Sequence, residues 1–132
     1  MCSSSFCFSS FRDIAHFLTA AVHAERLENG GEEILLRHYF GELQKYLVEF
    51  DAFRSIADAD DNFGYTTFFE QYQTGVLDMC RLVIAYAWSR FEPVDNEKGH
   101  ARTMNKNSYN KSMPNVIWLM SRCDEILKSR GV

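Results

Sequence analysis

Apolar residues recur at intervals of three and four positions along nearly the whole chain, which is the spacing of one face of an α-helix. No stretch shows the sustained two-residue alternation of a β-strand, and no segment repeats at a fixed period. The pattern predicts four helices, at about residues 11–28, 32–56, 68–91 and 114–130. We therefore expect an all-α fold, an antiparallel four-helix bundle with two long central helices, in one domain over residues 1–132.

Residues typical of helix caps and helix ends lie near these predicted boundaries. Ser10 and Asp13 are spaced as an N-cap and its capping-box partner for the first helix. Thr67 and Glu70 repeat this pattern ahead of the third helix. The glycine pair at 30–31 is expected to end the first helix, because glycine tolerates the left-handed conformation that follows a helix.

Three segments lie outside the predicted helices. Residues 1–9 form a Ser-rich leader, and residues 57–64 form a short acidic linker. Residues 94–113 form a polar loop of 20 residues before the last helix. Connections of this length are uncommon between bundle helices and are usually functional or mobile. The loop would let the last helix pack beside any other helix or exchange between two copies of the chain.

The second predicted helix carries more apolar surface than one packed face requires. Its apolar residues form two neighbouring stripes: Leu35, Tyr39, Leu43, Tyr46, Phe50 and Phe53, with Leu36, Phe40 and Leu47 beside them. This surplus predicts either a wide contact with the core or an additional buried surface. The additional surface would be a homodimer seam or a partner site, and both alternatives stay open.

Composition and charge exclude several classes of function. Hydrophobic residues make up 46% of the 132 residues, which is typical of a globular domain rather than a disordered chain. The net charge of −4 argues against strong, non-specific binding of nucleic acid. The charge is uneven, with −7 over residues 1–93 and +3 over residues 94–132. The apolar run from Leu82 to Trp88 is too short to cross a membrane and predicts instead the centre of the core.

The cysteines and the first residues predict a cytoplasmic protein. The N-terminal stretch has no basic region, and its apolar residues are interrupted by serines and charges, so it does not fit a secretory signal. Cys80 and Cys123 fall on apolar helix faces, where free cysteine behaves as a small buried hydrophobe. Cys2 and Cys7 lie in the leader, and no C-x-x-C pair occurs. We therefore expect reduced thiols.

The acidic segment between the second and third helices resembles the calcium-binding loop of EF-hand proteins. The resemblance covers 13 residues, 58–70, and requires Phe63 to be counted as an insertion. Its calcium ligands would be the side chains of Asp58, Asp60, Asn62 and Glu70. The same residues also fit a plain turn followed by a capping box, because Asp and Asn favour turns. A calcium- or metal-regulated helical protein therefore stays an alternative, and no metal site is favoured.

No sequence motif points to catalysis. The chain has neither a Gly-x-Ser-x-Gly nucleophile motif nor a glycine-rich phosphate loop. His16 and His23 are seven residues apart, whereas two metal ligands on one helix need a spacing of three or four. Together with His38, they fit the boundary of an amphipathic face. We therefore expect neither an enzyme nor a cofactor, with a ligand-binding or enzymatic bundle, its cavity lined by these histidines, as the alternative.

By elimination, we expect a small intracellular protein-binding module that acts as an inhibitor, an immunity-type protein or an adaptor. The acidic residues within 32–70 would match a basic surface on a partner protein, and exposed aromatic residues would anchor it. The candidate partner-binding residues are Asp58, Asp60, Asp61, Phe63 and Tyr65 at the acidic linker, with Lys98, Arg102 and Tyr109 in the polar loop. The basic residues of that loop leave a nucleic-acid binder as a further alternative.

Overall fold

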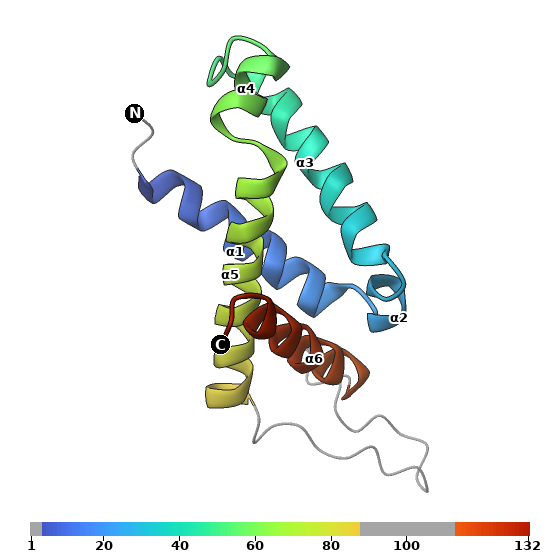
Figure 1. Ribbon diagram of the computed structural model, residues 1–132. Helices are drawn as coiled ribbons and strands as arrows, with labels where there is room; N and C mark the ends of the chain where they lie inside the picture. The colour runs from blue at the N-terminus through green and yellow to red at the C-terminus, as the bar shows by residue number, and fades with distance from the viewer. Residues whose placement is uncertain (1–3, 88–112) are drawn as a thin grey trace, which may run out of the picture.

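The computed structural model describes the backbone of residues 4–87 and 113–132 and the side chains of residues 11–85 and 113–132 (Figure 1). Every regular element in these ranges is helical, which confirms an all-α fold for the described chain. In chain order the elements are α1 (Ser4–Ala21), α2 (Ala24–Leu27), α3 (Gly31–Glu49), α4 (Ile56–Asn62), α5 (Tyr65–Leu82), the π-helical turn η1 (Val83–Ala87) and α6 (Met113–Ser129). None of these described helices combines the length and the apolar character needed to cross a membrane.

Helix α5 is the centre of the fold. It contacts α1, α3 and α6, and Figure 1 shows α1 and α6 crossing it rather than lying along it. The antiparallel four-helix bundle is therefore not confirmed. The helices α1 and α5 approach closely at Gly75, where a Cβ atom would come within 3.0 Å of the Ala15 Cβ and the Phe11 carbonyl oxygen. A glycine at this position lets the two helices meet.

The hydrophobic core lies where α1, α3 and α6 pack on α5. On α1 the apolar residues at helical spacing are buried: Phe11, Ile14, Ala15 and Leu18. The core also contains Leu36, Phe40, Phe68, Tyr72, Val76, Leu119 and Ile126. The Phe68 ring lies 5.7 Å from the Phe11 ring and 5.1 Å from the Phe40 ring. Such aromatic pairs add about 0.5–1.5 kcal/mol each beyond the burial of their surface, so this cluster fixes α1 and α3 to α5.

The first predicted helix has different boundaries in the structure. It begins at Ser4, so Ser10 lies inside α1 and is not the N-cap, and it ends at Ala21. The chain then turns before the four-residue helix α2. The cause is Asn115 on α6, whose side-chain amide donates to the Val22 carbonyl (2.7 Å) and accepts from the Ala24 N–H (2.9 Å). This buried side chain replaces hydrogen bonds that a continuous helix would have made.

The predicted acidic linker is largely a helix. The second predicted helix ends at Glu49, earlier than expected, and the chain turns through Asp51, which has a positive φ of 59°. Helix α4 follows, with Ser55 as N-cap; the Ser55 hydroxyl accepts a hydrogen bond from the Asp58 N–H at 3.2 Å. The Asp58 carboxylate in turn accepts from the Arg54 N–H at 3.0 Å. The periodicity predicts instead a second helix through residue 56 and then a turn at the Asp and Asn residues, although Ser55 and Asp58 have capping-box spacing.

The third and fourth predicted helices are found with shifted ends. Helix α5 begins at Tyr65 with Gly64 as N-cap, so the capping box predicted for Thr67 and Glu70 is wrong. The prediction that Leu82 to Trp88 forms the centre of the core is wrong for the part whose side chains are described, because Ile84 and Ala85 are exposed and Val83 is buried. The side chains of residues 86–88 lie outside the described part of the chain. The last helix is confirmed to within about a residue at each end.

The two cysteines whose side chains are described are buried, as predicted. Cys80 on α5 and Cys123 on α6 are free thiols within the core. The Cys123 Sγ lies 3.7 Å from the Val76 carbonyl oxygen, one helical turn before Cys80. Burial, together with the contact to Cys80, raises the pKa of the Cys123 thiol well above its usual range. Cys123 is therefore protonated at neutral pH and poorly nucleophilic.

Candidate functional site

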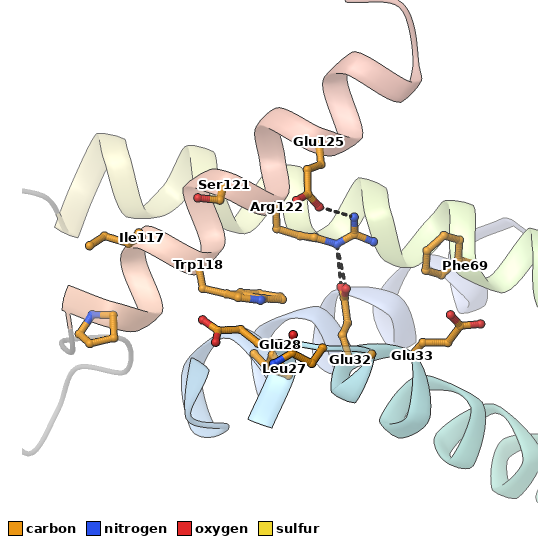
Figure 2. A pocket seen from close by; sticks show the side chains of 13 residues that line it. Leu27, Glu28, Glu32, Glu33, Phe69, Ile117, Trp118, Ser121, Arg122 and Glu125 are labelled. Carbon is orange, nitrogen blue, oxygen red and sulfur yellow. Dashed lines mark hydrogen bonds and ion pairs between the residues drawn. The ribbon is translucent and has the colours of Figure 1, made fainter. Parts of the chain in front are cut away.

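A pocket of about 770 Å³ opens between α6 and the turn that joins α2 to α3 (Figure 2). Trp118 and Arg122 line it from α6, and Glu28 and Glu32 line it from the opposite side. Phe69 on α5 contributes an aromatic ring. Its volume lies within the range of small-molecule binding pockets, which is about 300–1,000 Å³.

Three consecutive residues make the tight turn that forms one wall of this pocket. Asn29 and Gly30 have positive φ angles of 52° and 85°. At Gly31 a Cβ atom would lie 1.9 Å from the Arg26 carbonyl oxygen, so only glycine fits there. A helix does end just before the glycine pair, but it is the short α2 with Glu28 as its C-cap, and the two glycines are the N-cap and first residue of α3. The turn places Glu28 just before it and Glu32 just after it on the same pocket.

A shielded ion pair crosses the pocket from α6 to α3. The Arg122 Nε donates to the Glu32 Oε2 at 2.8 Å, and the side chains are only 18% and 13% exposed. The Tyr72 hydroxyl on α5 donates to the Glu32 Oε1 at 2.8 Å, and the Arg122 Nη1 donates to Glu125 at 3.0 Å. One carboxylate therefore joins three helices.

The pKa values of this network follow from burial and from the carboxylates. Burial opposes the positive charge of Arg122, but Glu32 and Glu125 outweigh it and raise the pKa of the guanidinium. Burial, reinforced by the negative charge of Glu32, raises the pKa of the Tyr72 hydroxyl far above its usual value. Arg122 therefore stays charged and Tyr72 stays neutral at any physiological pH.

The described lining of the pocket is acidic. It contains four carboxylates against one guanidinium: Glu28, Glu32, Glu33 and Glu125 against Arg122. Glu33 also pairs with Arg37 on the outer side of α3, at 3.0 Å. The Arg37 guanidinium lies 4.0 Å above the Tyr65 ring. The pocket therefore carries an excess of negative charge beside aromatic side chains.

A second candidate surface is the exposed α3 stripe, which we define as Leu35, Tyr46 and Phe50. At 100° per residue these three positions fall on one side of the helix, adjacent to the buried side formed by Leu36 and Phe40. Tyr46 is 54% exposed and Phe50 is 77% exposed. Their rings stack on each other with centroids 6.5 Å apart. Of the two stripes predicted on this helix, one is therefore in the core and much of the other faces solvent.

The acidic residues predicted as partner-binding or metal-binding lie on helices rather than in a loop. Asp58, Asp60 and Asn62 are part of α4, so the loop geometry behind the EF-hand resemblance is not formed. Asp58 accepts from the Asn62 side chain at 3.0 Å, and Asp60 accepts from Gln44 on α3. Glu70 lies on α5. Among the residues whose side chains are described, no group of three or more His, Cys, Asp or Glu is arranged to hold a metal ion.

The remaining sequence candidates divide between the core, the surface and the undescribed segment. Phe63 is half-buried against the rings of Phe11 and Phe40, and Tyr65 is half-buried against Phe69. Asp61 is exposed on α4. Most of the predicted polar loop lies outside the described residues, and its candidates are Lys98, Arg102 and Tyr109.

The histidines do not form a site in the described chain. His16, His23 and His38 are all exposed, and none lines a described pocket. The sequence pattern did not single out Arg122 or its pairing with Glu32. The available signal was a single arginine one turn after Trp118, on the side of the helix that carries Leu119 and Cys123.

No protein-family model matches this chain, and neither a curated protein nor a solved structure matches it. Its function must therefore be inferred from the two surfaces described above. One is the acidic and aromatic pocket, and the other is the exposed α3 stripe.

Proposed function

We propose that this chain is a small protein-binding module that acts inside the cell as an inhibitor, an immunity-type protein or an adaptor. The observation that carries the proposal is the pair of stacked, exposed rings of Tyr46 and Phe50 on α3. Aromatic residues are enriched at the centres of protein interfaces, where burying them supplies much of the binding free energy. Together with Leu35 they give α3 an apolar side that the described fold leaves in water.

The charge around the exposed α3 stripe indicates the chemistry of the partner. Residues 32–70 contain nine acidic and three basic residues. Glu49, Asp51 and Asp61 are exposed near the end of α3 and on α4. A partner protein with an apolar depression surrounded by lysine and arginine would match this surface. Association with such a partner should be faster at low ionic strength, because exposed charges are screened by salt.

Native mass spectrometry of the gently purified protein, followed by affinity measurement with any stoichiometric partner, tests the proposal. The test variant is Phe50→Asp, which places a charge beside Tyr46 at the end of the exposed α3 stripe. The matched control is Phe17→Asp, which changes another exposed phenylalanine, on α1. We expect Phe50→Asp to weaken binding at least about 30-fold, as loss of an interface anchor worth about 2 kcal/mol requires. We expect Phe17→Asp to leave binding unchanged.

Two results would contradict the proposal. A partner that binds the Phe50→Asp variant as tightly as the unchanged protein does not use this surface. A complex that contains only two copies of this chain, and that Phe50→Asp dissociates, makes the exposed α3 stripe a homodimer seam instead.

A further inference from the structure

The carboxylates of the acidic pocket are not equally compensated. Arg122 pairs with both Glu32 and Glu125, and Arg37 pairs with Glu33. The Glu28 carboxylate makes no hydrogen bond or ion pair with any residue whose side chain is described. Four carboxylates against two guanidiniums leave the pocket an excess of negative charge, and Glu28 is the lining carboxylate that has no partner among the described residues.

Trp118 provides an aromatic surface in the same part of the pocket. Figure 2 shows the indole of Trp118, from α6, facing Glu28 across the opening. Tryptophan is the aromatic side chain that attracts a cation most strongly, because of the negative potential over its ring face. A carboxylate beside that face adds a charge partner for the same cation.

Other classes of ligand fit this pocket less well. An anion would meet the excess of carboxylates, and Arg122, the basic residue in the described lining, is already paired with two of them. A purely apolar ligand would remove water from Glu28 without replacing its hydrogen bonds, which costs free energy. A flat or elongated cation can stack on Trp118 and pair with the Glu28 carboxylate at the same time.

The pocket and the exposed α3 stripe lie on the same side of α3. Glu32 and Phe50 are 18 residues apart, which is about five turns at 3.6 residues per turn. The distance along the helix is about 27 Å at 1.5 Å per residue. A standard protein interface of about 800 Å² per partner is roughly 30 Å across, so one partner can cover both features.

We propose that the pocket receives a cationic side chain, arginine or lysine, from the protein that docks on the exposed α3 stripe. Trp118 stacks on the cation and Glu28 pairs with it. This inference rests on the proposed function, since the cation is supplied by the partner. It predicts that basic residues of the partner contribute to affinity through one specific pocket and not only through diffuse attraction.

The pocket can be tested without the partner by titrating the full chain with N-acetylarginine amide. The readout is the NMR signal of the Trp118 indole N–H, which a Trp118→Phe variant identifies because the chain has two tryptophans. The neutral control ligand is N-acetylcitrulline amide, which has nearly the same shape without the charge. We expect a saturable shift with the arginine amide and none with the citrulline amide.

Matched variants locate the charge partner. Glu28→Gln should weaken binding of the arginine amide about two- to fivefold, as expected for a partly exposed ion pair. Glu25→Gln, on the same short helix but outside the pocket lining, should leave it unchanged. Equal shifts with the two amides, or a Glu28→Gln variant that binds as the unchanged protein does, would overturn the cation site.

The partner experiment separates this inference from the proposed function. If a partner is captured through Phe50 but Glu28→Gln leaves its affinity unchanged, the pocket inference fails and the docking surface stands. If the arginine amide binds but no protein partner is found, the partner as the source of the cation is wrong. The pocket is then a site for small organic cations.

Discussion

Glu32 and Arg122 are 90 residues apart in the sequence, yet the Arg122 Nε lies 2.8 Å from the Glu32 Oε2. Tyr72 donates a hydrogen bond to the same carboxylate from α5. Bringing two charges out of water costs nearly as much as their attraction returns, so the net stabilisation from such a pair is small. Removing one partner is costly, because the other charge is then left shielded from water and unpaired.

The Glu32–Arg122 pair should therefore be sensitive to single substitutions. We expect Arg122→Met and Glu32→Gln each to lower the free energy of unfolding by about 2–3 kcal/mol, somewhat less than for a fully buried pair. The double variant should lose less than the sum of the two single losses, giving a coupling of about 1 kcal/mol or more. Urea unfolding of the four proteins measures both quantities.

The exposed Asp124–Lys128 pair on the same helix is the matched control for this cycle. Asp124→Asn should leave the midpoint of unfolding almost unchanged, because solvent screens such pairs. If Arg122→Met were as mild as Asp124→Asn, the pair would not hold α3 and α6 together.

Gly75 and Gly41 should respond in opposite directions to the same substitution. At Gly75 an added Cβ meets Phe11 and Ala15 at 3.0 Å, so Gly75→Ala forces α1 away from α5 and should cost about 1–3 kcal/mol. At Gly41, inside α3, an added Cβ meets nothing within 4 Å. Gly41→Ala should stabilise the protein by about 0.5–1 kcal/mol, because alanine favours the helix. Thermal and urea unfolding measure both changes in stability, and a Gly75→Ala variant at least as stable as the unchanged protein would contradict the close packing at Gly75.

Asn115 should be required as an amide, not merely as a polar residue. Asn115→Asp keeps the oxygen that accepts from the Ala24 N–H but removes the donor to the Val22 carbonyl, and it places a charge at a buried site. We expect a loss of about 1–3 kcal/mol, the range for a buried group left without its partner. Faster hydrogen exchange at Ala24 should accompany the loss if the break between α1 and α2 loosens first. Asn62→Asp also removes an amide donor, but at an exposed site on α4, and should cost less because water replaces the lost hydrogen bonds and screens the new charge.

Features that depend on local spacing could be predicted from the sequence. The first apolar stripe, from Phe11 to Leu18, follows helical periodicity and is buried as expected. The last helix has a proline in its first turn and a glycine after its end, and its bounds agree with prediction. The tight turn at Gly30 was also visible, because glycine pairs mark such turns.

Features that depend on distant residues could not be predicted in this way. The break after Ala21 requires the side chain of Asn115, which comes from the other end of the chain. The pocket requires α6 to lie against the α2–α3 turn, and no periodicity encodes which helices become neighbours. Helix α4 is a different case, because the sequence does contain its N-cap, Ser55. The aspartates that follow Ser55 are also typical of a turn, and a turn was predicted there.

Arg12 on α1 pairs with Asp78 on α5, so the free energy of unfolding should depend on pH in the acidic range. Hydrogen bonds from Arg81 and then from Arg12 hold the pKa of the Asp78 carboxyl below its usual value. A lowered pKa in the folded state means that the stabilisation is complete above the unfolded pKa of about 3.9 and is lost as pH falls through the folded value. Asp78→Asn should therefore cost up to about 1 kcal/mol at pH 7, the range for a largely solvated ion pair.

The difference between Asp78→Asn and the unchanged protein should hold from pH 7 to about pH 5 and shrink toward zero below about pH 3.9. One molar salt at pH 7 should also reduce it, because Arg12 and Arg81 are largely exposed. Urea unfolding across this pH range measures the effect, with Asp61→Asn on the exposed side of α4 as the control. A difference that persists unchanged at pH 2 would mean that Asp78 acts through its shape and packing rather than through its charge.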